Sequence, residues 1–144
     1  MKQPHSRVRL AVVVGGALGT ALRDGIAHLV DNVGDLPVAT LGVNVLGAFL
    51  LGVIVGTGWS WTPVGRSLVI TGLLGGLTTF STFTIEVVRL EQASRSTSAA
   101  TYLIASLALG MGAAAAGQAL GRWRVATTRI HDEEHRHVAD EVGL

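Results

Sequence analysis

The chain has 144 residues, of which 49% are hydrophobic and only 15% are charged. That length suffices for one domain and is too short for two ordinary ones, and soluble domains carry about 25% charged residues. The absence of Cys excludes disulfides, thiolate metal sites and cysteine nucleophiles. A net charge of +1 is too small to indicate nucleic-acid binding.

Charged residues are clustered, and three long segments between the clusters contain none. Leu36–Gly65 holds 30 residues without Asp, Glu, Lys or Arg, Ser67–Ile85 holds 19, and Ser96–Gly121 holds 26. A helix that crosses a bilayer needs about 20 mostly apolar residues. Each segment is therefore predicted to contain a transmembrane helix.

The first apolar segment, Leu10–Val30, is interrupted by Arg23 and Asp24. A cleaved signal peptide is the alternative for it, but the apolar run leads into Arg-Asp and not into a clear small-residue cleavage site. We therefore predict an all-α membrane protein, because isolated strands cannot satisfy their backbone in lipid. Its four transmembrane helices are expected at about 8–30, 37–58, 66–90 and 97–122.

The composition changes at residue 122. We expect residues 1–122 to form the transmembrane domain and residues 123–144, rich in Arg, His, Asp and Glu, to form a polar, flexible tail. With four helices both termini lie on one side of the membrane. That side carries eight Lys and Arg residues and the other side three, so the positive-inside rule favours cytoplasmic termini.

Glycines recur at four-residue spacing in every predicted helix. Such small residues let helices approach closely in lipid, where water no longer drives association. Close packing explains most of them, and it also suggests oligomerisation. The pairs are Gly15/Gly19, Gly52/Gly56, Gly72/Gly76 and Gly117/Gly121.

The third predicted helix contains Gly75–Phe83, with the sequence GGLTTFSTF, near its middle. Paired glycines followed by β-branched residues with hydroxyl groups disfavour a continuous helix. A broken helix at membrane depth is tolerated where it is buried in protein or lines a watery cavity. An ordinary helix with a few back-bonded hydroxyls is the alternative, and composition alone leaves both open.

Several polar side chains lie on helical stripes inside the predicted spans. Thr40 and Asn44 have i, i+4 spacing, as do Tyr102 and Ser106. Such groups can serve as contacts between helices, and an Arg near an interface can reach out to water. A polar stripe on several helices together is also typical of a hydrated path. The costly charged members of this set are Arg23 and Glu86.

Three motifs closely resemble those of the Fluc/CrcB family of small fluoride channels. Residues 15–23, GGALGTALR, are similar to the family's GGxxGxxxR pattern, and residues 40–52, TLGVNVLGAFLLG, to its TxxVNxxGxFxxG pattern. Residues 75–83 are similar to its third-helix signature, and this similarity implies a third helix that is broken near its middle. The three occur in the expected order, which makes the resemblance specific.

The resemblance implies an antiparallel, dual-topology homodimer in the plasma membrane that passes fluoride passively and is not an enzyme. It implies Arg23 and Glu86 as vestibule residues. Because a ring edge carries the positive part of the aromatic quadrupole, two phenylalanines can present edges to an anion without trapping it. The implied fluoride pore residues are Thr40, Asn44, Phe80, Thr82, Phe83, Tyr102 and Ser106.

The resemblance also implies a structural Na⁺ at the dimer interface, held by the main-chain carbonyls of Gly75 and Thr78. Two departures from the family pattern matter. Ala108 and Gly110 stand where relatives can carry hydroxyls, and the charge bias is large for a strictly dual-topology protein. One subunit of a heterodimeric fluoride channel is therefore an alternative. A small dual-topology multidrug or cation antiporter and a non-transporting assembly subunit are others.

Overall fold

The computed structural model describes the backbone of residues 5–58 and 60–142, and the side chains of 5–58 and 60–127. All of its regular elements in this part are helical, which confirms the all-α prediction. The only strand-like pairing there is an isolated bridge between Val33 and Leu36. The helices are α1 (His5–Leu29), α2 (Val38–Thr57), α3 (Pro63–Arg66), η1 (Ser67–Leu74), α4 (Gly75–Leu77), α5 (Phe80–Gln92) and α6 (Ser96–Val142).

Four stretches are long and apolar enough to cross a membrane: His5–Leu29, Val38–Thr57, Pro63–Gln92 and Ser96–Thr127. They coincide with the four predicted spans to within about five residues at each end. The chain is thus a multi-pass membrane protein.

The third span is broken, as the family resemblance implied, but the break lies beyond the paired glycines. Gly75 is helical, whereas Thr78 and Thr79 have extended backbones, with ψ angles of 153° and 125°. Before the break, η1 winds as a π-helix, which the sequence did not predict. The break is sharp because Thr79 caps the next helix: its side chain accepts a hydrogen bond from the Thr82 backbone N–H.

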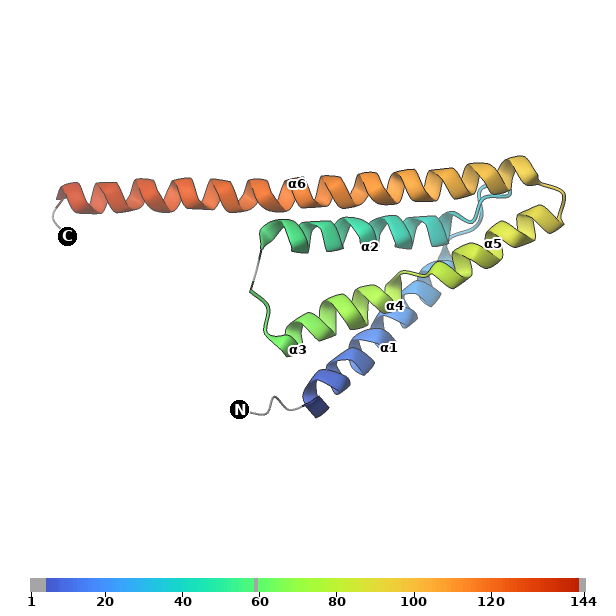
Figure 1. The fold of residues 1–144 in the computed structure, drawn as a ribbon, viewed down its shortest axis with the longest axis horizontal. Helices are drawn as coiled ribbons and strands as arrows, with labels where there is room; N and C mark the ends of the chain where they lie inside the picture. The colour runs from blue at the N-terminus through green and yellow to red at the C-terminus, as the bar shows by residue number, and fades with distance from the viewer. Residues whose placement is uncertain (1–4, 59, 143–144) are drawn as a thin grey trace.

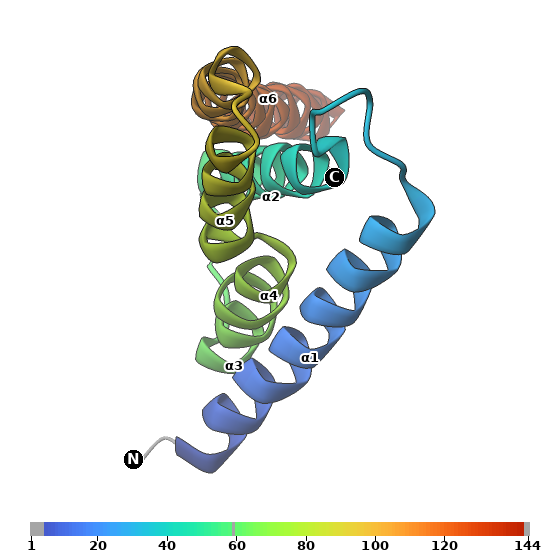
Figure 2. The same ribbon diagram turned by 90° about the vertical axis from the view of Figure 1, so that its right-hand side faces the viewer.

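The helices form two closely packed pairs, one of α1 with η1 and α4, the other of α2 with α6 (Figures 1 and 2). In the first pair, an added Cβ at Gly15 would overlap the Leu68 carbonyl oxygen, and one at Gly19 would overlap the Leu73 carbonyl oxygen. Gly76 faces the Gly16 carbonyl in the same seam. These backbones touch directly, so side chains larger than hydrogen are excluded there.

The second pair repeats this construction. Added Cβ atoms at Gly52 and Gly56 would overlap the carbonyl oxygens of Ala114 and Gln118, and one at Gly117 would overlap that of Phe49. The predicted glycine spacings thus mark two helix–helix seams.

The break transfers the third span from one pair to the other. The described residues of η1 and α4 pack on α1, whereas α5 packs on α6 and makes no contact with α1. Figure 1 shows the result: the two pairs meet at the end that carries the Asp31–Pro37 and Ala93–Arg95 turns, and they diverge towards the other end. The molecule is therefore wedge-shaped.

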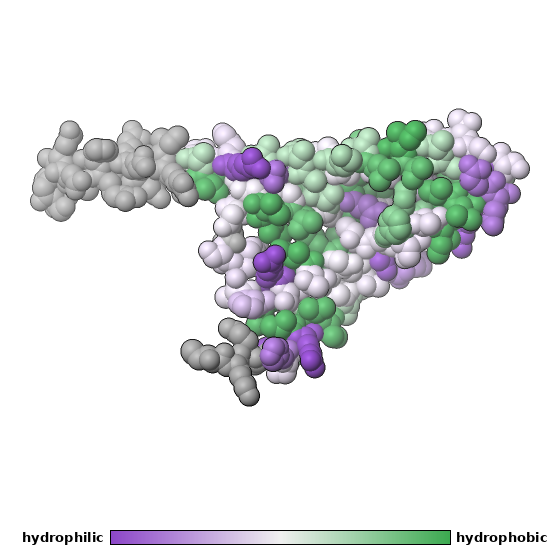
Figure 3. All heavy atoms as spheres, in the orientation of Figure 1, coloured by the Kyte–Doolittle hydropathy of each residue, from purple (hydrophilic) through white to green (hydrophobic). Residues whose placement is uncertain are grey.

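The surface of the wedge is largely apolar. Figure 3 shows hydrophobic residues along the flanks and strongly hydrophilic ones gathered towards the ends. Large exposed apolar side chains include Leu18 of α1 and Met111 of α6, which is 75% exposed. Such a surface fits lipid contact or a second subunit.

Helix α6 continues to Val142, past residue 122, where we expected the transmembrane domain to end. The side chains of residues 128–144 lie outside the described part. The division into a domain of residues 1–122 and a flexible tail of 123–144 stays a prediction.

Candidate functional site

A cavity of about 420 Å³ lies where the wedge narrows, bordered by α2, the broken span and α6. Its walls are mainly apolar, with polar groups from the break on one side. Six of the predicted channel or ion-binding residues line it: Asn44, Gly75, Thr78, Phe80, Phe83 and Ser106. Ser106 comes from α6, and its buried hydroxyl oxygen has no hydrogen-bond partner within the described residues.

Asn44 holds the break in place. Its Nδ2 donates to the Thr79 carbonyl oxygen over 3.0 Å, and its Oδ1 accepts from the Thr79 N–H over 2.8 Å. The second bond satisfies an N–H that has no acceptor in the preceding helix, and the first adds a donor at the carbonyl of the residue that caps α5. Asn44 thus uses one of its two amide hydrogens on the backbone and keeps the second beside the cavity.

The hydroxyls after the break are linked to one another. Thr79 Oγ1 donates to Thr82 Oγ1 over 3.0 Å and also accepts the Thr82 backbone N–H. A contact of 3.3 Å joins Thr79 Oγ1 and Ser81 Oγ. Thr82, predicted to line the pore, is engaged in this cap and does not border the cavity.

These side-chain bonds leave two carbonyls of the break without their helical donors. The Thr79 N–H, which would reach Gly75 in a continuous helix, bonds Asn44; the Thr82 N–H, which would reach Thr78, bonds Thr79 Oγ1. No hydrogen bond outside regular helices reaches either carbonyl in the described part of the chain. The Gly75 and Thr78 oxygens are thus available acceptors.

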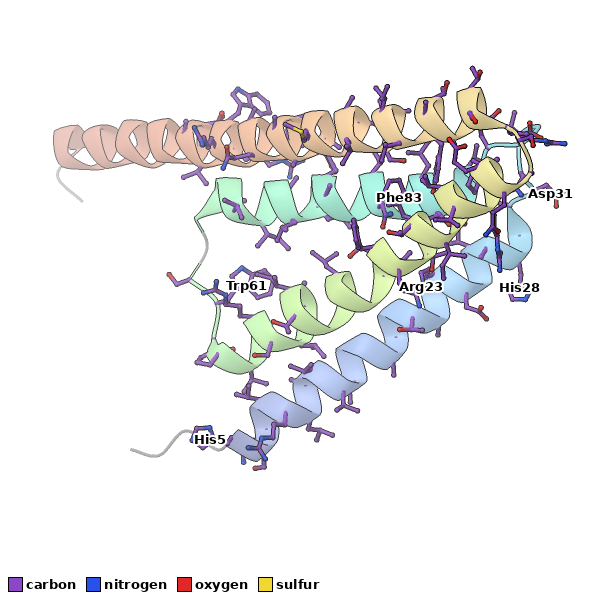
Figure 4. All side chains as sticks on the ribbon, turned by 45° about the vertical axis from the view of Figure 1, so that its right-hand side comes forward. His5, Arg23, His28, Asp31, Trp61 and Phe83 are labelled. Carbon is purple, nitrogen blue, oxygen red and sulfur yellow. The ribbon has the colours of Figure 1, made fainter. Side chains whose placement is uncertain are left out.

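Of the two carbonyls between them, that of Gly76 has a charged partner. Arg23 of α1 donates from Nη1 to the Gly76 oxygen over 3.1 Å, and Figure 4 shows its side chain directed at the broken span. The expected position of Arg23 at a vestibule stays a prediction. The structure adds that its guanidinium bonds the backbone just before the break.

Aromatic rings form one wall of the cavity. The Phe80 and Phe83 centroids lie 6.0 Å apart with ring planes at 43°, and Phe83 lies 5.3 Å from Tyr102 at 49°. Phe83 and Tyr102 are buried, whereas Phe80 is 79% exposed. Tilted rings of this kind present edges as well as faces to their surroundings.

Beyond Tyr102, a carboxylate lies inside the membrane span. Glu86 accepts hydrogen bonds from Thr40 Oγ1 over 2.7 Å and from the Tyr102 hydroxyl over 2.6 Å, one at each carboxylate oxygen. Three predicted residues thus meet in one network, although none of them borders the large cavity. The two hydroxyls offset part of the cost of holding a carboxylate at this depth.

Glu86 also borders a second cavity, of about 240 Å³, at the loop end of the wedge. That cavity is lined further by Asp35, Arg89 and Arg95. Phe83 borders the first cavity and contacts Tyr102, and Tyr102 bonds Glu86. The described residues therefore connect the two cavities through an unbroken series of side-chain contacts.

Sequence reasoning missed two parts of this arrangement. Thr79 was noted as one more hydroxyl, but it is the residue that Asn44 binds and that starts α5; its T-x-x-T spacing to Thr82 was a usable capping signal. No sequence pattern predicted the second cavity. Asp35 and Arg95, which line it, lie in two turns that only the folded chain brings together.

The fold and the site define a class: a small four-span membrane protein whose broken helix and polar side chains lie between two cavities. A comparison with known families matches residues 10–118 to the family described as CrcB-like protein, Camphor Resistance (CrcB). The chain belongs to the CrcB-like family.

Curated relatives cover most of the chain. A protein of Rhodospirillum centenum named "Fluoride-specific ion channel FluC" is 40% identical over 124 residues, which span 81% of this chain and 97% of the relative. Proteins of the same name from Hahella chejuensis and Xanthomonas euvesicatoria are 42% and 41% identical, over 98% and 92% of their lengths. The match extends over nearly the whole of each relative.

Proposed function

We propose that this chain forms a fluoride-selective passive channel that exports F⁻ across the plasma membrane. The observation that carries the proposal is the series of contacts from Asn44 and the two Phe rings, through Tyr102, to Glu86. It joins a cavity inside the wedge to a cavity at its loop end. The relatives that the chain matches over nearly their whole length are named fluoride-specific channels.

The chemistry of the path suits a small, strongly accepting anion. The free amide hydrogen of Asn44 and the unpartnered Ser106 hydroxyl can donate to F⁻, and ring edges at Phe80 and Phe83 add weak positive potential. None of the residues that line the large cavity is Lys or Arg. Weak donors let an ion leave again, as conduction requires.

Passive export follows from weak-acid chemistry. HF crosses the membrane as a neutral molecule and dissociates in a more alkaline cytosol, which leaves F⁻ trapped. A selective F⁻ pore lets the accumulated ion leave down its gradient and lowers cytoplasmic fluoride.

A complete pore needs a second subunit. The large cavity is open to one side of the wedge, and Phe80 beside it is mostly exposed. An antiparallel homodimer would cover this opening and would place two paths in one assembly. A homologous partner of opposite orientation is the alternative, since the uneven distribution of Arg disfavours free insertion in both directions.

A structural Na⁺ fits the acceptors at the break. The carbonyl oxygens of Gly75 and Thr78 are hard ligands, they border the open cavity, and their helical donors have been diverted. Two such pairs from two subunits would supply four oxygens. The ion would join the subunits and would not be transported.

The test is fluoride efflux from liposomes that contain the purified protein, with chloride as the control anion. Fast, electrogenic and F⁻-selective efflux supports the channel. If efflux requires co-reconstitution with a homologous subunit, the heterodimer is the functional form. An absence of fluoride flux in both preparations would refute the proposal.

A further inference from the structure

A fixed positive charge lies beside the oxygens that fit a cation at the break. Arg23 of α1 bonds the Gly76 carbonyl oxygen over 3.1 Å, and its side chain is directed at the broken span (Figure 4). Gly76 faces α1, whereas its neighbour Gly75 and Thr78 border the cavity. Because the backbone of a helix has a radius of only about 2.3 Å, the guanidinium lies within about 10 Å of an ion on the cavity side.

The charge of Arg23 is not paired. Arg23 forms no ion pair with a carboxylate in the described part of the chain. The next residue, Asp24, approaches His28 instead, over 3.7 Å, and these two side chains are 74% and 75% exposed. Water therefore screens the charge of Asp24 more than that of Arg23, which is partly buried.

The carboxylate of the third span lies farther from the break. Glu86 comes seven residues after Thr79, about 10 Å along α5 at a rise of 1.5 Å per residue. Its two oxygens accept hydrogen bonds from Thr40 and Tyr102. None of the residues that line the large cavity is acidic. The charge that bonds the break itself is thus the positive one of Arg23.

The same hydrogen bond limits the number of oxygens that an ion can reach. Because Arg23 occupies the Gly76 carbonyl, each subunit offers the carbonyls of Gly75 and Thr78, and two subunits would offer four neutral oxygens. Ca²⁺ usually takes six to eight oxygens, several of them from carboxylates. Both the ligand number and the nearby charge therefore disfavour a divalent ion.

We infer that Arg23 determines the specificity of the ion site: it restricts the carbonyls at the break to a monovalent cation. The repulsion between Arg23 and a bound cation is proportional to the charge of the cation, so it is twice as large for Ca²⁺ as for Na⁺. The factor by which Arg23 weakens Ca²⁺ binding is therefore the square of the factor for Na⁺. This inference rests on the proposed ion site and assigns a residue to its selectivity.

The first experiment measures cation binding through stability in the purified full-length protein. Thermal midpoints are recorded against Na⁺ or Ca²⁺ concentration, with N-methylglucamine chloride holding the ionic strength constant. We expect Na⁺ to stabilise wild type and Ca²⁺ not to do so at the same concentration. In R23Q the apparent dissociation constant should fall about tenfold for Na⁺ and about a hundredfold for Ca²⁺. R23K, which keeps the charge, should retain the preference of wild type for Na⁺.

The matched control is R9Q, which removes the same charge from the exposed N-terminal end of α1, at the far end of the wedge (Figure 1). It should bind both ions like wild type. A second variant keeps the guanidinium and its bond to Gly76. Ala27 is exposed one turn beyond Arg23, so A27E places a carboxylate beside the arginine. It should shift both constants in the direction of R23Q, by a smaller factor.

The second experiment measures equilibrium binding of radiolabelled Na⁺ and Ca²⁺ to the same preparations. An unchanged preference in both R23Q and A27E, or an equal change in R9Q, overturns the inference. A wild type that binds Na⁺ and Ca²⁺ equally well also overturns it. A wild type that binds neither ion refutes the proposed ion site and the inference together. Fluoride efflux is measured separately, so a protein that binds Na⁺ and passes no fluoride refutes the proposed channel alone.

Discussion

Two regions of this chain are held together in different ways. In the seams between α1 and η1 and between α2 and α6, glycines bring backbones into direct contact, and shape alone fixes the packing. At the break, where the third span passes from one pair to the other, polar side chains make the connections. Asn44 binds Thr79, and Thr40 and Tyr102 bind Glu86.

The difference follows from what each region has to satisfy. Helices in a seam have already paired their backbone groups, so they need only small residues to pack closely in lipid. The N–H of an extended residue such as Thr79 has no acceptor in the preceding helix, and lipid cannot supply one. The side chains that satisfy the break are therefore polar, and they are available to an ion in the same place.

The largest effect is expected in a seam. Gly117→Val places a side chain against the Phe49 carbonyl, whereas a Cβ added at Gly112 on the same helix has no atom of the other helices within 4 Å, so Gly112→Val is the control. Overpacking of this kind costs about 3 kcal/mol. The midpoint of thermal aggregation in detergent should drop strongly for Gly117→Val and little for Gly112→Val. An equal drop for both would contradict the assignment of the seam.

At the break we expect a smaller loss of stability. Asn44→Ala removes both bonds to Thr79 and leaves the Thr79 N–H unsatisfied, at a cost of about 2 kcal/mol. Thr84→Ala is the control, because it removes only an exposed bond to the Phe80 carbonyl within α5. Thermal midpoints and fluoride efflux measure both variants. If Asn44→Ala matches Thr84→Ala in stability, the amide does not hold the break.

The seams could be predicted from sequence better than the junction. Spacings such as Gly52/Gly56 mark a helix face directly, because close packing requires small residues at i and i+4. No sequence pattern indicates which helices pack against each other. The pairing of α1 with η1 and of α2 with α6 is a property of the whole fold.

The break was predicted within four residues of its position, from Gly75 and the threonines that follow. Its true position depends on Asn44, which is 35 residues away along the chain and binds Thr79 and not Gly75. Similarly, Thr40, Tyr102 and Glu86 were each selected as polar residues in lipid. They form one network because α5 packs on α6, whereas the earlier part of the third span packs on α1. No local sequence pattern predicts this change of partner.

Substitution of the two phenylalanines tests packing and conduction separately. Phe83 is buried against Tyr102, so Phe83→Ile should lower both stability and flux; Phe80 is 79% exposed, so Phe80→Ile should lower flux with little loss of stability. If the ring edge lowers the free-energy barrier to fluoride passage by about 1.4 kcal/mol, its loss would slow efflux about tenfold. Normal fluoride efflux in both variants would contradict the ring-edge mechanism.

The smallest effect on stability is expected at the ion pair of Asp35 and Arg95, which is partly exposed at the loop end. Exposed pairs contribute about 0–1 kcal/mol, so Asp35→Asn should shift the thermal midpoint by little. It should nevertheless raise fluoride efflux at low ionic strength, because it removes one of the two carboxylates of the loop-end cavity and leaves both of its arginines. A variant that unfolds markedly earlier and conducts no faster would show that the pair clamps the two turns, and that stability and ion entry are not separate at this end of the wedge.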